Sequence, residues 1–424
     1  MKKVSDIKID IPKYPKEIIE TLESNGYQAY LVGGCVRDSI LGVEAFDYDI
    51  TTDAAPSEIK KIFKRTIDTG IAHGTVSVLF YDEGKPLTYE VTTFRIDGEY
   101  KDGRHPEDVI FVNDLKDDLL RRDFTVNAMA YNEITGLIDL FGGLHDLDKK
   151  IIRAVGDPIE RFTEDALRLM RAVRFSAKLG FNIENDTKDA IIKLASSLSK
   201  VSKERVNIEL TKTLTSKNPM NVQLFFEYGL SKYIAKGFDK INCGKIDPNL
   251  STHLAYACLF YNTDTNSAIR ILKDLKFDNS NINKIGLLLK GRKIYKNIKK
   301  YYESKNKEKF ELEIKDLIFN LKYELVYDFI TLLLINESNV KLIKKVLSII
   351  YDCQRTFTPI FLSDLNIKGN DLIQIGFKGE EIGVSLNSLL KIVHKNKDYN
   401  DKEKLISLAK KAYDRISGGI YELQ

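Results

Sequence analysis

Cysteine is scarce and long apolar runs are missing from this 424-residue sequence, and both absences narrow its class. The four cysteines, Cys35, Cys243, Cys258 and Cys353, lie far apart and form no Cys-x-x-Cys pair, which argues against a disulfide framework and against a zinc site. The charged N-terminal stretch has no apolar segment of signal-peptide length, and no later stretch is long enough to cross a membrane. We therefore expect a cytoplasmic protein with no membrane partner.

The chain is too long for one ordinary hydrophobic core, so we expect two to four domains. Its net charge of +4 is unevenly distributed. Residues 1–150 carry nine more acidic than basic residues, whereas residues 151–424 carry thirteen more basic than acidic residues. An acidic part suits metal coordination and a basic part suits a phosphate backbone, although many Lys-rich helices are simply solvated. The two parts are therefore expected to have different partners.

Strand-like runs dominate the first 150 residues, and helical periodicity dominates the remainder. The runs are YQAYLVGG, FDYDITT, TVSVLFY, LTYEVTTF and DVIFV, several of them with apolar residues at every second position. From Asp157 onward the spacing is helical, with Asp157-Pro158 and Thr163 as candidate helix starts and Gly180 as a candidate stop. We predict an α+β domain with a single mixed sheet of about five strands, followed by an all-α remainder.

Two carboxylates and a glycine turn lie close together in the segment LVGGCVRDSILGVEAFDYDITT. A strand leads into Gly33 and Gly34, a short helix follows, and a second strand carries Asp47 and Asp49 two residues apart. Alternation along a strand would put both carboxylates on one face, where they could share one divalent ion or bridge two, as phosphoryl transfer requires. Gly34 would let backbone N–H groups approach phosphates, and Arg37, one helical turn on, could reach a phosphate or ribose oxygen.

An isolated Asp-x-Asp is more often a solvated strand edge than a metal site. Here it follows a Gly-Gly turn and an Arg-Asp pair in the order strand, turn, helix and strand. This combination resembles the signature of class II CCA-adding enzymes and bacterial poly(A) polymerases, within the DNA polymerase β superfamily of nucleotidyltransferases. Two further segments, RRDFTVNAMAYN at 121–132 and EDALRLMRAVRF at 164–175, resemble the next motifs of that family in order and spacing.

The resemblance implies a DNA polymerase β-like nucleotidyltransferase head in which Asp47 and Asp49 hold Mg²⁺. It also implies that Asp165 and Arg168 form a protein template for the incoming base. Cytosine and adenine each present an amino donor beside a ring-nitrogen acceptor, so a carboxylate can accept from the amino group while a guanidinium donates to the ring nitrogen. Uracil and guanine present a carbonyl oxygen and a ring N–H instead, so CTP and ATP should pass while UTP and GTP should not.

Other residues of the same motifs are expected to hold the rest of the nucleotide. By the resemblance, Arg122, Arg171 and Arg174 bind the triphosphate and ribose, and Asp123 and Asn127 support the site. In the segment 164–175, charged residues recur at three-residue steps, which would align them along one stripe of a single helix: Asp165, Arg168, Arg171 and Arg174. The alternative is an ordinary Asp–Arg pair on a solvated helix, which contributes roughly a few tenths of a kcal/mol.

A charged, glycine-containing stretch, TTFRIDGEYKDGRHPEDVIFV, lies between the carboxylates and the arginine motifs and predicts a mobile loop. It resembles the flexible loop that full CCA-adding enzymes retain and CC-only relatives have shortened. His105 stands where many relatives have arginine, and we interpret it as a solvated loop residue. The other histidines show no ligand spacing.

The helical part contains one strongly basic stretch. Residues 284–302 bring seven basic residues together with Tyr295, Tyr301 and Tyr302. Such a mixture can contact phosphates and stack on bases or sugars, although a Lys-rich solvated helix with tyrosines at the edge of a core fits the same pattern. Because the helical parts of the resembling family clamp the acceptor arm of tRNA, we expect an RNA partner for this stretch.

The order of domains in the resembling family suggests boundaries for this chain. The nucleotidyltransferase head would span residues 1–150, and a helical neck that carries the base-reading helix would span residues 151–215. A helical body at 216–330 and a helical tail at 331–424 would bind the acceptor arm and 3′ end of tRNA. The sequence does not indicate an oligomeric state.

The expected reaction is template-independent addition of C, C and A to the 3′ end of tRNA from CTP and ATP, with release of pyrophosphate. A poly(A) polymerase or a CC-only or A-only enzyme shares the motifs and differs in product. An RNA-binding protein with an inactive head is a further alternative, against which the intact Asp47 and Asp49 argue. A nucleotidyltransferase of the antibiotic-modifying kind would not need a basic helical half.

Overall fold

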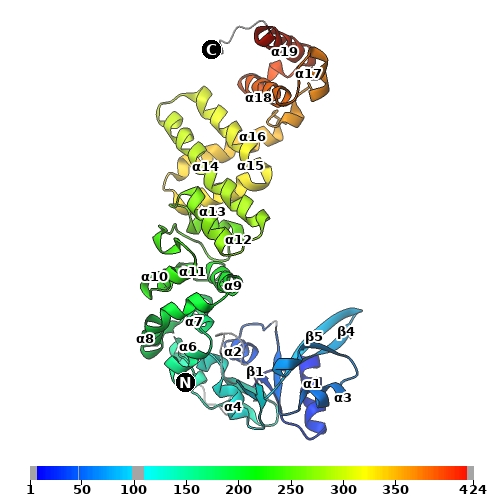
Figure 1. Ribbon diagram of the computed structural model, residues 1–424, viewed down its shortest axis with the longest axis vertical. Coiled ribbons are helices and arrows are strands. Elements are labelled where there is room, and N and C mark those ends of the chain that lie inside the picture. Colours follow the sequence, from blue (N-terminus) through cyan, green and yellow to red (C-terminus); the bar gives the residue numbers. More distant parts are fainter. Residues whose placement is uncertain (1–6, 46, 98–108, 418–424) are drawn as a thin grey trace. The chain divides into compact units, whose positions relative to one another are not determined.

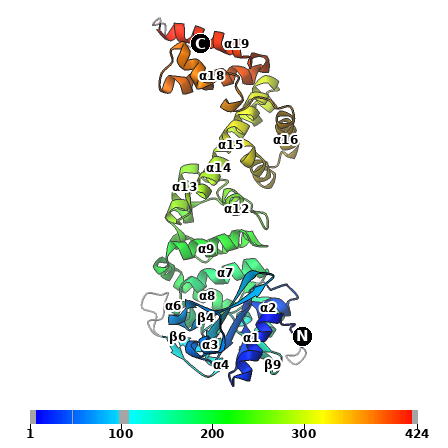
Figure 2. The ribbon, with the colours of Figure 1, turned by 90° about the vertical axis from the view of Figure 1, so that its right-hand side faces the viewer.

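The computed structural model describes residues 7–45, 47–97 and 109–417 (Figures 1 and 2). Contacts within the chain divide it into two compact units. Among the described residues, no helix is both long enough and apolar enough to cross a bilayer. Unit 1 comprises Met1–Lys240, Asp247–Leu250 and Ile271–Phe277, and unit 2 comprises Ile241–Ile246, Ser251–Arg270 and Asp278–Gln424.

Unit 1 is built on one mixed sheet of seven strands in the order β3-β4-β5-β2-β1-β8-β9. Strands β2 and β5 pair in parallel, and the other neighbours are antiparallel. The central strand β1 reads AYLV and is buried along its whole length, as expected of a strand covered on both faces. The strands are β1 Ala29–Val32, β2 Asp49–Thr52, β3 Thr66–Gly70, β4 Thr75–Asp82, β5 Lys85–Thr93, β8 Met129–Asn132 and β9 Gly136–Asp139.

The prediction of about five strands is wrong in number. Four of the predicted runs form β1, β2, β4 and β5, but DVIFV forms β7 (Val109–Phe111), which pairs with β6 (Arg95–Asp97) outside the main sheet. The missed strand β3 reads TIDTG and is largely exposed, so it has no apolar alternation to reveal it. The missed pair β8 and β9 is a short hairpin at the opposite edge.

Helices pack on the sheet and follow it along the chain. In Figure 1, α1 and α3 lie beside the sheet, and α1 contacts β1 and β2. A core of Tyr30, Val32, Phe94, Leu115, Leu119 and Ala130 joins β1 and β8 to α4, and it thereby fixes the helix that carries Asp118. The helices of unit 1 are α1 Lys13–Ser24, α2 Gly34–Ile40, α3 Pro56–Ile62, α4 Leu115–Leu120, α5 Gly143–Lys149, α6 Pro158–Glu164, α7 Leu167–Leu179, α8 Asn185–Leu194, α9 Lys203–Leu214, α10 Leu224–Glu227 and α11 Ser231–Ile234.

Helix ends follow the sequence signals closely after residue 150. Asp157 caps α6 by accepting hydrogen bonds from the backbone N–H groups of Ile159 and Glu160, and Pro158 occupies the first helical position. Gly180 ends α7 in the left-handed conformation, with φ 71°. Both of these predictions are confirmed, whereas Thr163 lies inside α6 and is not a helix start. A short parallel pair, β10 (Ile151–Ile152) and β11 (Asn182–Ile183), flanks these helices in sequence.

Among its described residues, unit 2 consists of helices joined by turns and loops and contains no β-strand. The run Lys307–Asn336 is interrupted at Lys322, whose backbone (φ 56°, ψ 167°) is not helical. The C-terminal part of unit 2 has a hydrophobic core of its own, which includes Leu365, Phe377 and Leu390. The helices are α12 Thr252–Leu259, α14 Asn279–Glu303, α15 Lys307–Asn336, α16 Val340–Arg355, α17 Gly369–Ile375, α18 Glu380–Lys395 and α19 Lys402–Ser417, while α13, Thr265–Asp274, has residues in both units.

Candidate active site

A glycine turn places Asp49 next to an arginine. Strand β1 ends at Val32, which lies opposite Asp49 at the start of β2. Gly33 follows with φ 81°, and a Cβ atom at this position would lie 3.1 Å from Nη1 of Arg122 and 3.9 Å from Oδ2 of Asp49. Only glycine combines this backbone conformation with so close an approach of two side chains. The turn therefore brings a guanidinium and a carboxylate near each other where β1 ends and β2 begins.

The two predicted metal-binding carboxylates differ in their surroundings. Strand β2 begins at Asp49, so Asp47 precedes the strand, contrary to the prediction that the strand carries both carboxylates. Asp47 is exposed and Asp49 is half-buried. Burial, followed by the negative charge of Asp47, raises the pKa of Asp49 to about 6, against a smaller opposing effect of Arg122.

The chemistry of this pair fits a divalent cation. A cation between the two carboxylates would relieve the repulsion that raises the pKa of Asp49. The described residues contain no group of three or more His, Cys, Asp or Glu side chains placed to bind a metal. A site with two carboxylates leaves the remaining coordination positions to water and phosphate oxygens, as is usual for hard cations that serve phosphoryl transfer.

Arg122 is held in place by a buried aspartate that the sequence prediction missed. Asp118 has no exposed surface, and its Oδ2 accepts hydrogen bonds from Nη2 of Arg122 at 3.2 Å and from the Thr51 hydroxyl at 3.2 Å. Its Oδ1 accepts from Nη2 of Arg121 at 2.7 Å. Burial would raise the pKa of Asp118, but the two guanidiniums outweigh it and lower the pKa. Asp118 therefore aligns Arg122 over Gly33.

A second network links the predicted supporting residues. Nη1 of Arg37 donates to the side-chain oxygen of Asn127, whose amide donates to Oδ1 of Asp123 at 3.0 Å. Nε of Arg171 donates to Oδ2 of Asp123 at 2.7 Å. Burial would raise the pKa of Asp123, but the charge of Arg171 and the bonds from Asn127 and Arg171 hold it at about 2. The chain of contacts joins α2, the 3₁₀ turn η3 (Thr125–Asn127) and α7.

Three of the predicted phosphate-binding arginines surround one aromatic ring. The guanidinium carbons of Arg37 and Arg171 each lie 5.4 Å from the centre of the Phe175 ring, and that of Arg174 lies 4.0 Å away. Arg174 also approaches the buried Glu209 of α9, with 2.6 Å between Nε and Oε2. Neither Phe175 nor Glu209 was singled out from the sequence, because each needs the fold to bring it to these arginines.

The predicted base-reading pair does not lie on one helix. Helix α6 ends at Glu164 and α7 begins at Leu167, so Asp165 lies between them with an extended backbone (φ −134°, ψ 102°). Its Oδ1 accepts from the N–H of Leu167 at 3.0 Å, and its Oδ2 accepts from Nη2 of Arg205 at 2.8 Å. The prediction of a single charged stripe on one helix is therefore wrong for Asp165.

Arg168 is buried and donates to groups other than Asp165. Its Nη1 bonds Oε2 of Glu164 at 2.5 Å and the carbonyl oxygen of Arg161 at 2.9 Å. Its Nη2 bonds the carbonyl oxygen of Arg121 at 2.8 Å. These three bonds use three of the five N–H donors of the guanidinium and fix its orientation. The predicted loop residue His105 lies outside the described residues.

Comparison with known proteins agrees with this geometry. Residues 29–153 match the family model described as "Poly A polymerase head domain", and residues 180–241 match the model described as "Probable RNA and SrmB- binding site of polymerase A". The fold, the motifs and these matches define a nucleotidyltransferase, a class that uses a divalent metal ion.

Relatives with known names narrow the class to one family. The CCA-adding enzyme of Ligilactobacillus salivarius is 38% identical over 400 residues, which cover 93% of this chain and 95% of that protein. The chain belongs to the family of CCA-adding enzymes. It is 54% identical to the CCA-adding enzyme of Lactiplantibacillus plantarum over 205 residues, a match that spans 48% of this chain and 49% of that relative.

Solved structures confirm the predicted architecture of a mixed-sheet head followed by helices. The crystal structure of the Bacillus stearothermophilus CCA-adding enzyme in complex with CTP matches with a TM-score of 0.75 and 28% identity, over 96% of this chain and 100% of that chain. The Thermotoga maritima CCA-adding enzyme complexed with tRNA_CCA shares the fold, with a TM-score of 0.62 and 22% identity over 94% of both chains.

Proposed function

We propose that this chain adds C, C and A to the 3′ end of tRNA from CTP and ATP with release of pyrophosphate, and that Asp47 and Asp49 hold Mg²⁺. The observation that carries the proposal is the match to a CCA-adding enzyme over 93% of the chain. The carboxylate pair beside the glycine turn is intact, which argues against an inactive head. The unpaired cysteines fit a cytoplasmic enzyme.

Side chains of the head and of the neck hold different parts of the nucleotide in this proposal. When bound, Mg²⁺ supplies charge neutralisation on the triphosphate and lowers the pKa of the attacking hydroxyl. Arg122, aligned by Asp118 beside Asp49, is placed to contact a phosphate held there. Arg171 and Arg174, gathered around Phe175, supply further positive charge for the triphosphate or ribose, and Gly34 lets the first turn of α2 approach it.

Base choice falls to Asp165 and Arg168 in this proposal. The Asp165 carboxylate accepts from the amino group of cytosine or adenine, and a guanidinium N–H of Arg168 donates to the adjacent ring nitrogen. The bonds of Arg168 to Glu164 and to the Arg121 carbonyl orient the guanidinium, and its Nε–H and one Nη2–H, which have no hydrogen bond among the described residues, can donate to the base. Uracil and guanine leave both protein groups unpaired, which costs the site its binding energy for UTP and GTP.

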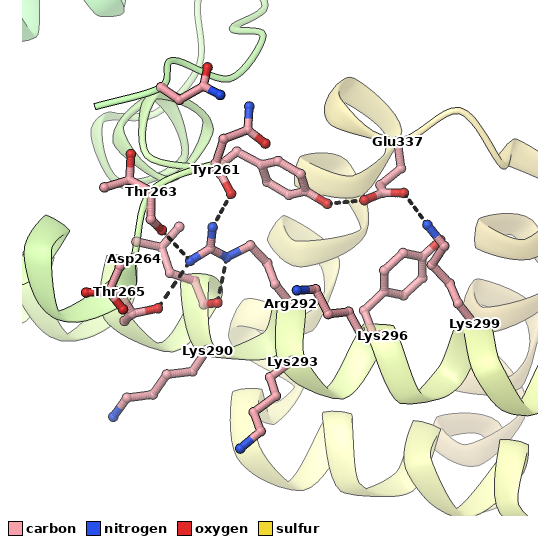
Figure 3. A pocket seen from close by; sticks show the side chains of 14 residues that line it. Tyr261, Thr263, Asp264, Thr265, Lys290, Arg292, Lys293, Lys296, Lys299 and Glu337 are labelled. Carbon is pink, nitrogen blue, oxygen red and sulfur yellow. Dashed lines mark hydrogen bonds and ion pairs between the residues drawn. The ribbon is translucent and has the colours of Figure 1, made fainter. Parts of the chain in front are cut away.

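We also propose that the head spans 1–150, the neck 151–215, the body 216–330 and the tail 331–424, with body and tail contacting the acceptor arm of tRNA. One candidate RNA surface lies within unit 2, where a hollow of about 650 Å³ is lined by a stripe of lysines along α14 (Figure 3). Lys299 is neutralised by Glu337 at 2.9 Å. The other members of the stripe, Lys290, Lys293 and Lys296, are exposed at three-residue steps and have no ion pair among the described residues.

This lysine stripe differs from the predicted surface in its aromatic component. Tyr295 is 2% exposed and packs edge-on against Phe329, with 6.4 Å between the two ring centres. It therefore belongs to the core of unit 2 and cannot stack on a base. Arg292 is likewise structural, because it donates to the carbonyl oxygens of Phe260 and Thr263. The exposed lysines alone provide the charge for a phosphate backbone.

The experiment that tests the proposed function offers tRNAs that end before CCA, after C and after CC to the purified enzyme, with each NTP supplied singly. The proposal predicts C addition to the first two substrates, A addition to the third, and no addition from UTP or GTP. Repeated A addition would identify a poly(A) polymerase. A stop after CC, or addition of A only, would identify the CC-only or A-only alternative.

A further inference from the structure

Both oxygens of the Asp165 carboxylate accept hydrogen bonds from the protein. The N–H of Leu167 bonds Oδ1 at 3.0 Å, and Nη2 of Arg205 bonds Oδ2 at 2.8 Å. The first bond ties the carboxylate to the start of α7, and the second, charge-assisted bond fixes its rotation about Cβ–Cγ. Each oxygen retains a second lone pair, so the carboxylate can still accept from the amino group of a base.

Arg205 lies on α9, which packs against α7 in unit 1 (Figures 1 and 2). Glu209 follows four residues later and therefore lies on the same face of α9. Its carboxylate is 4% exposed and lies 2.6 Å from Nε of Arg174 and 3.9 Å from Nη1 of Arg171. One helix face thus contacts the predicted base-reading carboxylate at one turn and the predicted triphosphate-binding arginines at the next.

We propose that Arg205 is a positioning residue for base selection, which holds the Asp165 carboxylate in the orientation that accepts the amino group of cytosine or adenine. The inference rests on the proposed function and extends it to a helix that had no role in nucleotide selection. The family model that matches residues 180–241 describes this segment as a probable RNA-binding site. The geometry gives α9 a second task, at the nucleotide.

The hydrogen bonding of Arg205 differs from that of a simple link between helices. A guanidinium that only connects two helices binds a carboxylate most strongly in a bidentate arrangement, through two parallel N–H···O hydrogen bonds. Arg205 uses Nη2 for Asp165, and its Nη1 is buried with no hydrogen-bond partner among the described residues. A donor beside the base-reading carboxylate therefore remains available to water or to a bound base.

Arg205→Ala removes one of two restraints on the Asp165 carboxylate. We expect kcat/KM for CTP and ATP to fall about tenfold while kcat/KM for UTP changes little, so that the CTP-to-UTP preference falls about fivefold to tenfold. Arg205→Lys keeps the charge and one donor and should recover part of that preference. The measurement is single-nucleotide extension of a tRNA that lacks CCA, with all four NTPs.

Two variants serve as controls. Asp148→Ala removes an exposed charge outside α9 and outside the segment that matches the RNA-binding model, and it should leave all four values unchanged. Glu209→Gln weakens the hold on Arg174 and should raise KM for every NTP together, with the base preference intact. Arg205 acts on selectivity and Glu209 on nucleotide affinity, although only one helical turn separates them.

The outcomes separate the inference from the function on which it rests. Equal losses for all four NTPs in Arg205→Ala, with no recovery in Arg205→Lys, would reduce Arg205 to a structural link and overturn the inference. If Arg205→Ala does not fold, as judged by its thermal unfolding, Arg205→Met decides, because it keeps the length of the side chain and removes its donors. A wild-type preference for CTP over UTP in Arg205→Met overturns the inference. A wild-type enzyme that extends no tRNA would contradict the proposed function as well.

Discussion

Asp49 and Asp123 show how the same residue type acquires opposite properties from its neighbours. Burial and the nearby Asp47 raise the pKa of Asp49 to about 6, whereas Arg171 and Asn127 hold the pKa of Asp123 at about 2 despite its burial. A carboxylate with unrelieved negative charge around it suits a cation, and one already neutralised by a guanidinium suits a structural role. This contrast supports the proposal that Asp49, rather than Asp123, takes part in metal binding.

At the residue scale, we predict that Asp47→Ala or Asp49→Ala abolishes nucleotide addition while tRNA affinity stays within a few-fold of wild type. The carboxylates act on the triphosphate, and the proposed RNA surface lies on other residues. Extension assays and equilibrium tRNA binding measure the two properties. Asp148→Ala, a change at an exposed aspartate of the same domain, is the matched control and should leave both unchanged. If a variant that carries both Asp47→Ala and Asp49→Ala adds nucleotides faster than a control without enzyme, the proposed role of these two residues is wrong.

Asp123 gives a prediction for stability and pH. Because its folded-state pKa of about 2 lies below the usual value, its ionised form stabilises the fold above the usual pKa, and this contribution is lost as pH falls through about 2. The contribution at neutral pH is about 2 kcal/mol. Asp123→Asn should therefore lower the free energy of unfolding at pH 7 by about this amount, with a smaller difference near pH 3. Denaturant titrations of both proteins across pH 2–7 measure it, and a difference independent of pH would contradict the account.

The sequence located the residues proposed to carry chemistry and the supporting Asp123 and Asn127, but it missed Asp118, Arg205 and Glu209, which contact them. The carboxylate pair and Asp123 belong to motifs with a recognisable order in the chain. Arg205 and Glu209 act on partners that lie in other elements of the fold, so no local pattern reveals them. Asp118 does have a local sequence signal. It precedes Arg121 by three positions and Arg122 by four, and this spacing favours ion pairs at the end of a helix.

At the scale of elements, the turns decide where the site residues lie. The sequence predicted the strand, turn, helix and strand around Gly33, and four of the five predicted strand runs exist in the sheet. It could not predict that β2 starts at Asp49 or that α6 ends one residue before Asp165. Element ends depend on tertiary packing, which local propensity does not describe. The break between α6 and α7 matters, because it frees Asp165 to accept from both Leu167 and Arg205.

Gly33 and Gly42 allow strain and contact to be separated in one turn–helix unit. Both have positive φ, 81° and 70°, so alanine at either position should cost about 1 kcal/mol or more in stability, with the larger cost at Gly33, whose ψ of −128° lies outside the left-handed helical region. A Cβ atom at Gly33 would press on Arg122 at 3.1 Å, whereas one at Gly42 has nothing within 4 Å. We expect Gly33→Ala to lose at least tenfold in kcat/KM and Gly42→Ala to stay near wild type. Equal activity losses in the two variants would show that the contact with Arg122 is unimportant.

At the scale of the whole molecule, the charge asymmetry of the sequence matches the proposed division of labour. The acidic first part contains the carboxylate pair, and the basic remainder contains the exposed lysine stripe of α14. The sequence located this basic stretch, but it could not separate Lys290, Lys293 and Lys296, which are exposed, from Arg292 and Tyr295, which are structural. Burial decides that difference, and it follows from how α12, α14 and α15 pack.

The lysine stripe predicts how tRNA binding responds to salt. Replacing Lys290, Lys293 and Lys296 together with alanine should weaken tRNA binding and reduce the slope of log affinity against log salt by about one for each phosphate that these lysines neutralise. Addition to saturating tRNA should be preserved, because the head is unchanged. Lys149→Ala, at an exposed lysine of α5 in the head, is the control for a nonspecific change of charge. A triple variant with wild-type salt dependence would remove this surface from the RNA interface.

The central claim is that protein side chains, rather than a nucleic-acid template, choose the base that this enzyme adds to tRNA. Single-nucleotide extension of a tRNA that lacks CCA, with kcat/KM measured for all four NTPs in wild type, Asp165→Ala and Arg168→Ala, tests it most directly. The account predicts that Arg168→Ala costs about 1 to 3 kcal/mol in selectivity, or about tenfold to a hundredfold. It also predicts that Asp165→Ala raises UTP and GTP incorporation relative to CTP and ATP. If the four values fall together in both variants, the base-reading role of these two residues is wrong.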